Sequence, residues 1–487
     1  MVTEEKELDR SRNKFLALLW TVVAVCITFV GCSQMGPISL HHAMINYDST
    51  VVKSEKELLL LNIVRSHYDQ PSHFTVCNST SASFNFSANH QILPTWNNPI
   101  TLGTTNTLGL NFGVTVSENP TMTIAPMQGK EFAQRFFKPL DTGIATTLFS
   151  QKGRNVDKLL RLTAHSFLLI RPNKLSSRTN GEIRKDVLQD VLDFLKQGGS
   201  GCFPKGGNQE SCLLVNNPPL GGKDSAEPTN SKRPMPTDKV RYELFRQVVL
   251  YIKAKELNHD LFFTTLEFEE DVKDSFYKET DSKSINIKDI ADALNKEYQI
   301  KRVCGGYKLV KPYKVPTVAD FPADKLDASH LKLIAEDFDL FGHLKSGLSV
   351  ILVLLRKDPW PIYGLFRLRN FSEVLHFLGE SLKKKAGYHY EIPVKPSKYT
   401  KCLAALQPGI FDNPDLTLKI NSETPSSESE TPSSKYVAVS VNYDGEPFSI
   451  SWEPTRWDIQ VFNLLYAIFQ MNRVEPKVSA PSTVIAK

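Results

Sequence analysis

The stretch that decides the fold runs from residue 108 to residue 124 and has the sequence LGLNFGVTVSENPTMTI. Its apolar residues recur at every second position from Leu108 to Val116, with small or polar residues between them. This period of two is typical of β-strands, and strand signals extend from Phe74 to Met127, interrupted by a turn predicted at Ser117–Pro120. We expect either a small sheet or a strand pair that adds to the sheet of a partner.

Helical signals lie on both sides of this segment. Ser54 and Glu57 form a capping box, in which each side chain satisfies a backbone N–H of the first helical turn. The helix that it opens runs through Val64 and is apolar on nearly all sides, so we expect it to be buried. Further helices are predicted at residues 131–138, 142–151, 155–170, 182–196, 242–257, 287–298, 371–384 and 457–471.

Strands alternate with the later helices. A hairpin is predicted from Ile300 to Val310, and residues 348–355 (LSVILVLL) fit a fully buried strand or helix. Asp444-Gly445 is a strong hairpin signal between YVAVSVNY and EPFSISW. The chain is therefore predicted to have an α+β fold with mixed helices and antiparallel sheets.

Composition and charge exclude several classes of protein. The 487 residues are 41% hydrophobic and 23% charged, which is close to the globular average and unlike a disordered chain. The net charge of +5 is a weak field over so long a chain. We therefore expect no nucleic-acid partner.

An export segment is predicted near the N-terminus. The apolar run from Phe15 to Val30 has the size of a signal-peptide core and is shorter than the ~20 residues that span a bilayer comfortably. It follows three basic residues, Arg10, Arg12 and Lys14. The alternative is an uncleaved single-span anchor in the inner membrane. Both interpretations place most of the chain outside the cytoplasm.

The end of this run resembles the lipobox of bacterial lipoproteins, because Gly31 stands directly before Cys32. The resemblance implies that the Cys32 thiol is acylated and that cleavage makes Cys32 the first residue of the mature chain. It also implies an outer-membrane lipid anchor facing the periplasm, since Ser33 is not the Asp that marks inner-membrane retention. A fully acylated cysteine would hold the protein durably to a membrane.

The remaining cysteines agree with export. Cys202 and Cys212 flank the sequence GCFPKGGNQESC, whose glycines and proline allow it to close on itself. A disulfide there would stabilise the fold by about 2 to 3 kcal/mol in the chain-entropy model. We expect no metal at these cysteines, because neither has a companion ligand at zinc spacing. Cys77, Cys304 and Cys402 are expected to be small buried hydrophobes.

Changes of amino-acid composition along the chain suggest how it is divided into domains and linkers. A Gly/Pro/Asn-rich stretch interrupts the helices and strands after residue 197. The predicted parts are a lipoprotein signal peptide (1–31), a tether (32–53), an N-terminal α+β domain (54–197), a disulfide-containing insertion (198–239), a C-terminal α+β domain (240–474) and a flexible tail (475–487).

A family resemblance rests on three groups of segments. The first is KELLLLNIVRSHYDQP; the second is NPTMTIAPMQGKEFAQRFFKPL with KLLRLTAHSF; the third is FRLRNFSEVLHFLGE with the C-terminal hairpin and VFNLLYAIFQ. Together they resemble a family of uncharacterised proteobacterial lipoproteins, over most of the mature chain. The family offers no catalytic residue to transfer.

No nucleotide-binding or metalloprotease motif is present in the sequence, and we expect no cofactor. The chemistry-bearing candidates are an acidic cluster (Glu267, Glu269, Glu270, Asp271 and Asp274) and the i, i+4 pair of Asp339 and His343. We expect the acidic cluster to be a solvated strand end and turn, and we expect Asp339 and His343 to form ordinary core or surface pairs. The leading hypothesis is a non-enzymatic envelope lipoprotein that binds other proteins in an assembly, named by analogy as the outer-membrane core of a type IV secretion system. The alternative is an envelope hydrolase or glycan-binding lipoprotein that uses these carboxylates.

Overall fold

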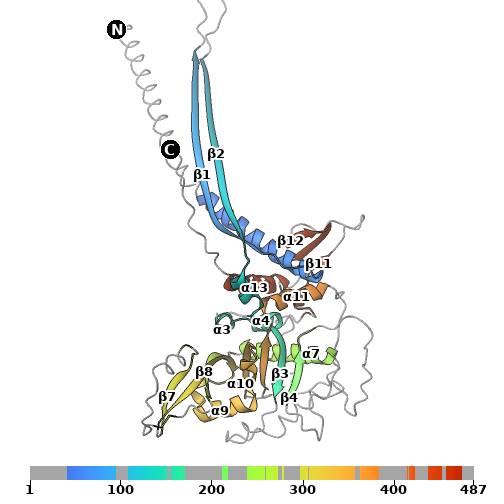
Figure 1. Cartoon of the computed structure of the whole chain (residues 1–487). Helices are drawn as coiled ribbons and strands as arrows, with labels where there is room; N and C mark the ends of the chain where they lie inside the picture. Colours follow the sequence, from blue (N-terminus) through green and yellow to red (C-terminus); the bar gives the residue numbers. More distant parts are fainter. Residues whose placement is uncertain are drawn as a thin grey trace, which may run out of the picture. The chain divides into compact units, whose positions relative to one another are not determined.

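The computed structural model describes most of the chain between residues 41 and 473. The described residues are 41–94, 108–150, 155–170, 211–217, 238–257, 259–272, 277–278, 295, 297–304, 306–356, 362–382, 414, 416–422, 437–451 and 457–473. They belong to two compact units (Figure 1). The first unit contains the segment Phe74–Pro126, and the second contains Leu59–His73 and Met127–Glu475.

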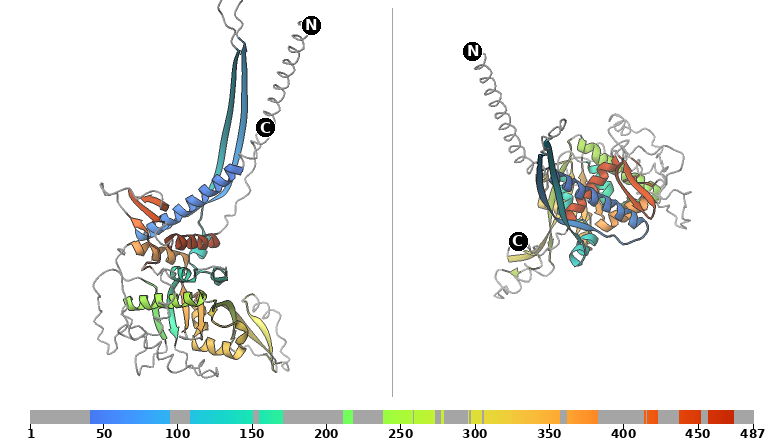
Figure 2. Two further views of the ribbon diagram at one scale, coloured as in Figure 1. Left: turned by 180° about the vertical axis from the view of Figure 1, so that it is seen from behind. Right: turned by 90° about the horizontal axis from the view of Figure 1, so that it is seen from above.

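Strands β1 (Thr75–Pro94) and β2 (Leu108–Pro126) form a long antiparallel ribbon in the first unit. Their pairing runs from Thr75 opposite Pro126 to Pro94 opposite Leu108, with one bulge between Cys77 and Ser79. At about 3.4 Å per residue the ribbon is roughly 60 Å long, and its strands run side by side throughout (Figure 2). The period of two therefore predicted these strands correctly.

The predicted turn at Ser117–Pro120 is wrong. These residues continue β2 and pair with Ala82–Asn85 of β1. A proline is tolerated in a strand that lies at the edge of a sheet, because its missing N–H need not face a partner strand. The long-range ladder therefore prevails over a local turn signal.

The helix predicted from Ser54 begins earlier, and residues 41–67 are helical. Residues 41–53, predicted as part of the tether, therefore belong to a helix. Inside it the hydroxyl groups of Ser49 and Thr50 donate to the Asn46 carbonyl oxygen, at 2.9 and 2.7 Å. Because these short side chains bond one turn back, they do not interrupt the helix.

One mixed sheet organises the second unit. Its main path has the strand order β4-β3-β10-β9-β8-β5. These strands are β3 (Ala164–Ile170), β4 (Ser211–Val215), β5 (Phe262–Asp271), β8 (Gly306–Ala319), β9 (Val350–Leu355) and β10 (Ile362–Leu368), and the short β6 (Tyr277–Lys278) and β7 (Gln299–Val303) pair with β8. Only β8 and β9 pair in parallel among the described strands. The sheet thus joins strands from the predicted N-terminal and C-terminal domains.

The helix predicted over residues 155–170 is correct only in its first half. Helix α4 (Val156–Thr163) ends where β3 begins at Ala164. Antiparallel pairing with β10 sets Phe167 opposite Phe366, and the Arg369 N–H donates to the Thr163 carbonyl oxygen at 2.8 Å. Pairing with a strand about 200 residues away therefore decides the conformation of this apolar segment.

Helices cover the sheet and form a separate layer. Ile334 of α9 (Ala328–Asp337), Leu340 of α10 (Leu340–Lys345) and Phe338 between the two helices form a core with the apolar residues of β5, β8, β9 and β10. The other helices are α2 (Lys130–Phe137), α3 (Thr142–Ser150), α7 (Asp238–Leu257), α11 (Phe371–Leu382), α13 (Trp457–Asn472) and the short 3-10 helix η1 (Ala323–Lys325). All residues of β9 are buried, as predicted for LSVILVLL.

A small second sheet contains β11 (Asn421–Ser422), β12 (Val437–Tyr443) and β13 (Glu446–Ser451) in the order β11-β13-β12. Asp444 and Gly445 connect β12 to β13 with φ angles of 51° and 84°. This confirms the predicted hairpin, because such a turn needs positive φ at both central residues. The α+β class is therefore confirmed, with helices and mostly antiparallel strands in the same unit.

No helix in the described part of the chain is long and apolar enough to cross a membrane. The apolar run Phe15–Val30 lies outside the described residues, and so does the predicted helix at 182–196. The export segment and the lipid anchor therefore stay predictions.

Candidate functional site

The predicted modification sites are only partly within the described residues. Cys32, Cys202 and Cys402 lie outside them. Cys212 lies in β4, is only 5% exposed and is disulfide-bonded. The pairing of Cys212 with Cys202 stays a prediction.

Two further cysteines are not part of a disulfide. Cys77 lies in β1 and is half-buried, whereas Cys304 is exposed at the end of β7. The expectation that both are small buried hydrophobes is therefore wrong for Cys304. It follows the short strand β7, all of whose residues before Val303 are exposed.

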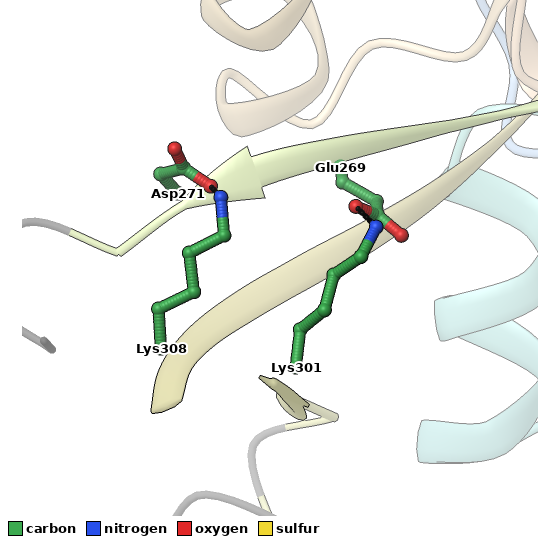
Figure 3. Close-up of polar contacts among 4 residues, drawn as sticks. All are labelled: Glu269, Asp271, Lys301 and Lys308. Atoms are coloured by element: carbon green, nitrogen blue, oxygen red, sulfur yellow. Dashed lines mark hydrogen bonds and ion pairs between the residues drawn. The ribbon is translucent and has the colours of Figure 1, made fainter. Parts of the chain in front are cut away.

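The acidic cluster lies on the edge strand β5 and is neutralised by lysines (Figure 3). Glu269 Oε2 lies 2.5 Å from Lys301 Nζ of β7, and Asp271 Oδ1 lies 2.6 Å from Lys308 Nζ of β8. Both pairs connect neighbouring parts of one sheet at its exposed margin. Such surface pairs contribute at most about 1 kcal/mol each, so they fit a solvated sheet edge.

Glu270 is also engaged. Its carboxylate accepts a hydrogen bond from Lys345 at the end of α10 and another from the Tyr313 hydroxyl group at 3.4 Å. The bond to Glu270 raises the pKa of Lys345, and burial raises the pKa of Tyr313. Glu267 is exposed on the same strand, and Asp274 lies outside the described residues.

Asp339 and His343 lie at the start and in the last turn of the short helix α10. Asp339 lies at the N-terminus of α10 with a φ angle of 44°, and its carboxylate lies close to Gly342. Asp339 and His343 are joined through the backbone, where the His343 N–H donates to the Asp339 carbonyl oxygen at 3.2 Å. In the described residues, no three His, Cys, Asp or Glu side chains are grouped as metal ligands would be.

A buried cluster of cations, which sequence reasoning missed, joins the segments of the second unit. Its first member is Arg369, which follows β10 and is 4% exposed. Its guanidinium donates to the carbonyl oxygens of Ala164 and Asn216, the latter at 2.6 Å, and lies 3.8 Å from the Phe377 ring centroid. Burial lowers the pKa of Arg369 to about 9. Arg369 therefore ties the ends of β3, β4 and β10 to α11.

Arg161 of α4 is the second member. It donates to the Tyr242 hydroxyl group of α7 at 3.3 Å and lies 5.3 Å from the Trp457 ring, over which Lys158 also lies at 4.4 Å. The Trp457 indole N–H donates to the Thr417 carbonyl oxygen at 2.9 Å. Burial lowers the pKa of Arg161. These contacts join α4, α7 and α13.

A third group contains buried charges of both signs. Lys253 Nζ of α7 lies 2.8 Å from Glu256 Oε2 and 3.8 Å from Asp157 Oδ1 of α4. Burial raises the pKa of Glu256 although Lys253 opposes the shift. Nearby in sequence, burial lowers the pKa of His165 in β3, and the charges of Arg369 and Arg367 add to the effect. The contacts of Lys253 with Glu256 and Asp157 thus join α7 to α4.

The segments that carry the family resemblance lie partly together in the second unit, whereas residues 56–58 and 119–126 belong to the first unit. The layer that they form is connected by three ring contacts and one β-bridge: Tyr68 with Tyr443 at 5.4 Å, Phe136 with Phe371 at 5.7 Å, Phe371 with Phe469 at 5.9 Å, and Pro139 with Asn370. Packing contacts therefore connect the parts of these segments that lie in the second unit.

The ribbon of β1 and β2 differs from the rest of the chain in charge. No Asp, Glu, Lys or Arg occurs between Gln70 and Ser117, although 23% of all residues are charged. The two strands pair only with each other among the described strands. At the end of the ribbon near Pro126, Ile124 is 65% exposed and its neighbour Thr123 is exposed as well. Successive residues lie on opposite faces of a strand, so both faces of β2 reach solvent there.

The pairing register divides the ribbon into an apolar and a polar face. On the first face lie Phe84, Phe86, Ala88 and Ile92 of β1 with Leu108, Leu110, Phe112, Val114 and Val116 of β2, and the exceptions are His90 and Glu118, which lies opposite Phe84. On the second lie Ser83, Asn85, Ser87, Asn89 and Gln91 with Gly109, Asn111, Gly113, Thr115 and Ser117, and the exception is Leu93. A two-faced ribbon with open edges and a single charged residue, Glu118, is the feature of this molecule best suited to bind another protein.

Comparison with known proteins identifies no relative: no family model, curated protein or solved structure matches this chain. The resemblance to proteobacterial lipoproteins therefore stays a prediction.

Proposed function

We propose that this protein is a non-enzymatic structural component of a cell-envelope assembly, held to the outer membrane through lipidated Cys32 and facing the periplasm. The observation that carries this proposal is the ribbon of β1 and β2. An isolated two-stranded hairpin is at best marginally stable in water. A ribbon of this length therefore gains stability when a partner pairs with it or covers it.

The edges of the ribbon support the same proposal. Monomeric proteins usually protect exposed strand edges with charged side chains, prolines or bulges. Between the bulge near Cys77 and the end of β1 at Pro94, the outer edge of β1 carries no Asp, Glu, Lys or Arg. Such an edge is open to pairing with another chain.

The second unit supplies a rigid body for such an assembly. Arg161 and Arg369 join α4, α7, α11, α13 and the central sheet through buried contacts. The hydrolase or glycan-binding alternative gains no support from the described carboxylates, because Glu269, Glu270 and Asp271 are each paired with a lysine. The outer-membrane core of a type IV secretion system remains the assembly named by analogy.

The test compares the protein with its Cys32→Ser variant after gentle detergent extraction of membranes. We expect the original chain to co-purify with envelope proteins in fixed stoichiometry, and the variant to lose both the membrane fraction and these partners. The proposal would be contradicted if the protein were a monomer that co-purifies with no other envelope protein and whose membrane association is unchanged by Cys32→Ser. A glycan-hydrolysing activity abolished by Glu269→Gln, with the fold retained, would favour the alternative.

A further inference from the structure

We infer that the ribbon pairs edge to edge with the ribbon of a second copy of this chain, β1 of one copy beside β2 of the next. The inference rests on the proposed function and names its partner. It starts from the two open edges of the ribbon, each of which lacks a neighbouring strand among the described residues.

The faces of the ribbon favour an identical partner. When a second ribbon joins at the edge, its residues extend the two existing faces, so the alternation of both ribbons must agree. An identical ribbon meets this condition because its alternation is the same. Its face with Phe86 and Val114 extends the apolar face of the first ribbon, and its face with Ser87 and Thr115 extends the polar face. A partner with another pattern would place polar residues on the apolar face.

The absence of charge favours self-association as well. In an array of identical ribbons any charge on β1 or β2 recurs in every copy, and like charges that lie opposite each other on neighbouring strands are destabilising. From Gln70 to Ser117 the chain carries no Asp, Glu, Lys or Arg that could repel its copy. The first charged residue of β2 is Glu118, near Pro120, whose ring removes one backbone donor. The expected contact on β2 therefore covers residues 108–117.

The topology of the ribbon permits repetition. Copies related by rotation about an axis along the strands have ribbons that point the same way, so β2 of one copy and β1 of the next run antiparallel. This repeats the kind of ladder already present inside the ribbon. The contact is heterologous, because two different edges meet, and it generates a ring when the rotation closes.

Single-cysteine variants test the contact between copies. Ser87 and Thr115 face each other within one ribbon, so a chain that carries only one of the two cysteines cannot link them internally. Ser87→Cys and Thr115→Cys are made separately, with Cys77, Cys304 and Cys402 replaced by Ser, and each carries a different tag. A short thiol cross-linker still joins the two cysteines if the register between the copies is shifted. Ser83→Cys and Gln91→Cys, each combined with Thr115→Cys in the other copy, measure the size of such a shift.

We expect the co-expressed mixture to yield cross-linked dimers carrying both tags, several-fold more abundant than the dimers from either variant alone. The extracted protein should also have a mass above that of a monomer by light scattering. Thr115→Lys should reduce the mass toward that of the monomer, since it places a positive charge at every contact and sets the lysines of successive copies only two strand spacings apart, whereas Thr115→Ser should not. Circular dichroism checks that both variants fold.

Contrary outcomes distinguish this inference from the function on which it rests. A monomeric chain without mixed-tag dimers overturns the self-pairing, but the proposed function survives if other envelope proteins still co-purify in a Cys32-dependent manner. Links only between two copies of Ser87→Cys, or a ribbon that binds lipid vesicles as a monomer, would also overturn it. A monomer without any partner contradicts both.

Discussion

The His67 Nδ1 atom lies 3.0 Å from the carbonyl oxygen of Gly379 in α11. The backbones approach closely here, because a Cβ atom at position 379 would meet the amide nitrogen of His67 at 2.9 Å and the carbonyl oxygen of Ile63 at 3.0 Å. Glycine at this position therefore sets the distance between α11 and the helix over residues 41–67.

The variant Gly379→Ala should be destabilised by about 1 to 2 kcal/mol. Alanine favours a helix over glycine by up to about 1 kcal/mol, but overpacking against backbone atoms typically costs about 1 to 3 kcal/mol and cannot be relieved by a rotamer change. Urea unfolding of the Cys32→Ser form measures the difference. His376→Ala, at an exposed position of the same helix, is the control. A stabilised Gly379→Ala protein would show that the two helices lie further apart.

Arg369→Lys should lower the free energy of unfolding by about 2 kcal/mol. A lysine ammonium cannot reproduce the planar fork that reaches the carbonyl oxygens of Ala164 and Asn216, and a buried acceptor left unsatisfied costs about 1 to 3 kcal/mol. Arg367→Lys, at an exposed position of β10, should change the stability by less than about 0.5 kcal/mol. Equal effects of the two substitutions would contradict the structural role of Arg369.

Glu256→Gln should flatten the dependence of stability on pH. Burial raises the pKa of Glu256 in the folded state, so the native protein binds more protons than the unfolded chain between the ordinary pKa of 4.5 and the raised value. Stability from this residue is present below pH 4.5 and is lost as the pH rises through the folded pKa. Urea unfolding at several pH values measures the slope. Glu267→Gln, at an exposed position, should leave it unchanged.

Removing the acidic cluster should have little effect on stability. Glu269→Gln and Asp271→Asn delete exposed ion pairs with Lys301 and Lys308, and each should cost at most about 1 kcal/mol at low salt. The cost should shrink further at 1 M salt, because screening weakens exposed pairs. Co-purification of envelope partners should be unchanged. Loss of a bound divalent cation in either variant, measured by calorimetry, would show that the cluster holds a ligand.

The predicted disulfide can be assigned directly. Proteolysis under non-reducing conditions should release one peptide pair in which Cys202 is joined to Cys212, detected by mass spectrometry. Cys202→Ser should lower stability by about 2 to 3 kcal/mol, as expected for a loop of this size. A link from Cys212 to Cys402 would replace the predicted pairing.

Local sequence determined those elements whose signals lie within a few residues of each other. The alternation from Leu108 to Val116 predicted β2, and Asp444-Gly445 predicted the hairpin of β12 and β13. The Asn370 side chain accepts from the Glu373 N–H at 2.7 Å, while Glu373 accepts from the Asn370 N–H at 3.1 Å. This capping box marks the start of α11, because both partners lie in one turn.

Tertiary structure decided what depends on residues far apart in the chain. Residues 164–170 form a strand because β10 pairs with them, although their apolar pattern also suits a helix. Arg369 is buried and Arg367 is exposed, and no local pattern distinguishes them, since burial depends on the carbonyl oxygens that β3 and the residue after β4 bring to Arg369. For the ribbon, the sequence shows the lack of charge from Gln70 to Ser117, and only the register shows that most of its apolar residues share one face. Periodicity is a property of neighbouring residues, whereas pairing and burial are properties of the folded chain.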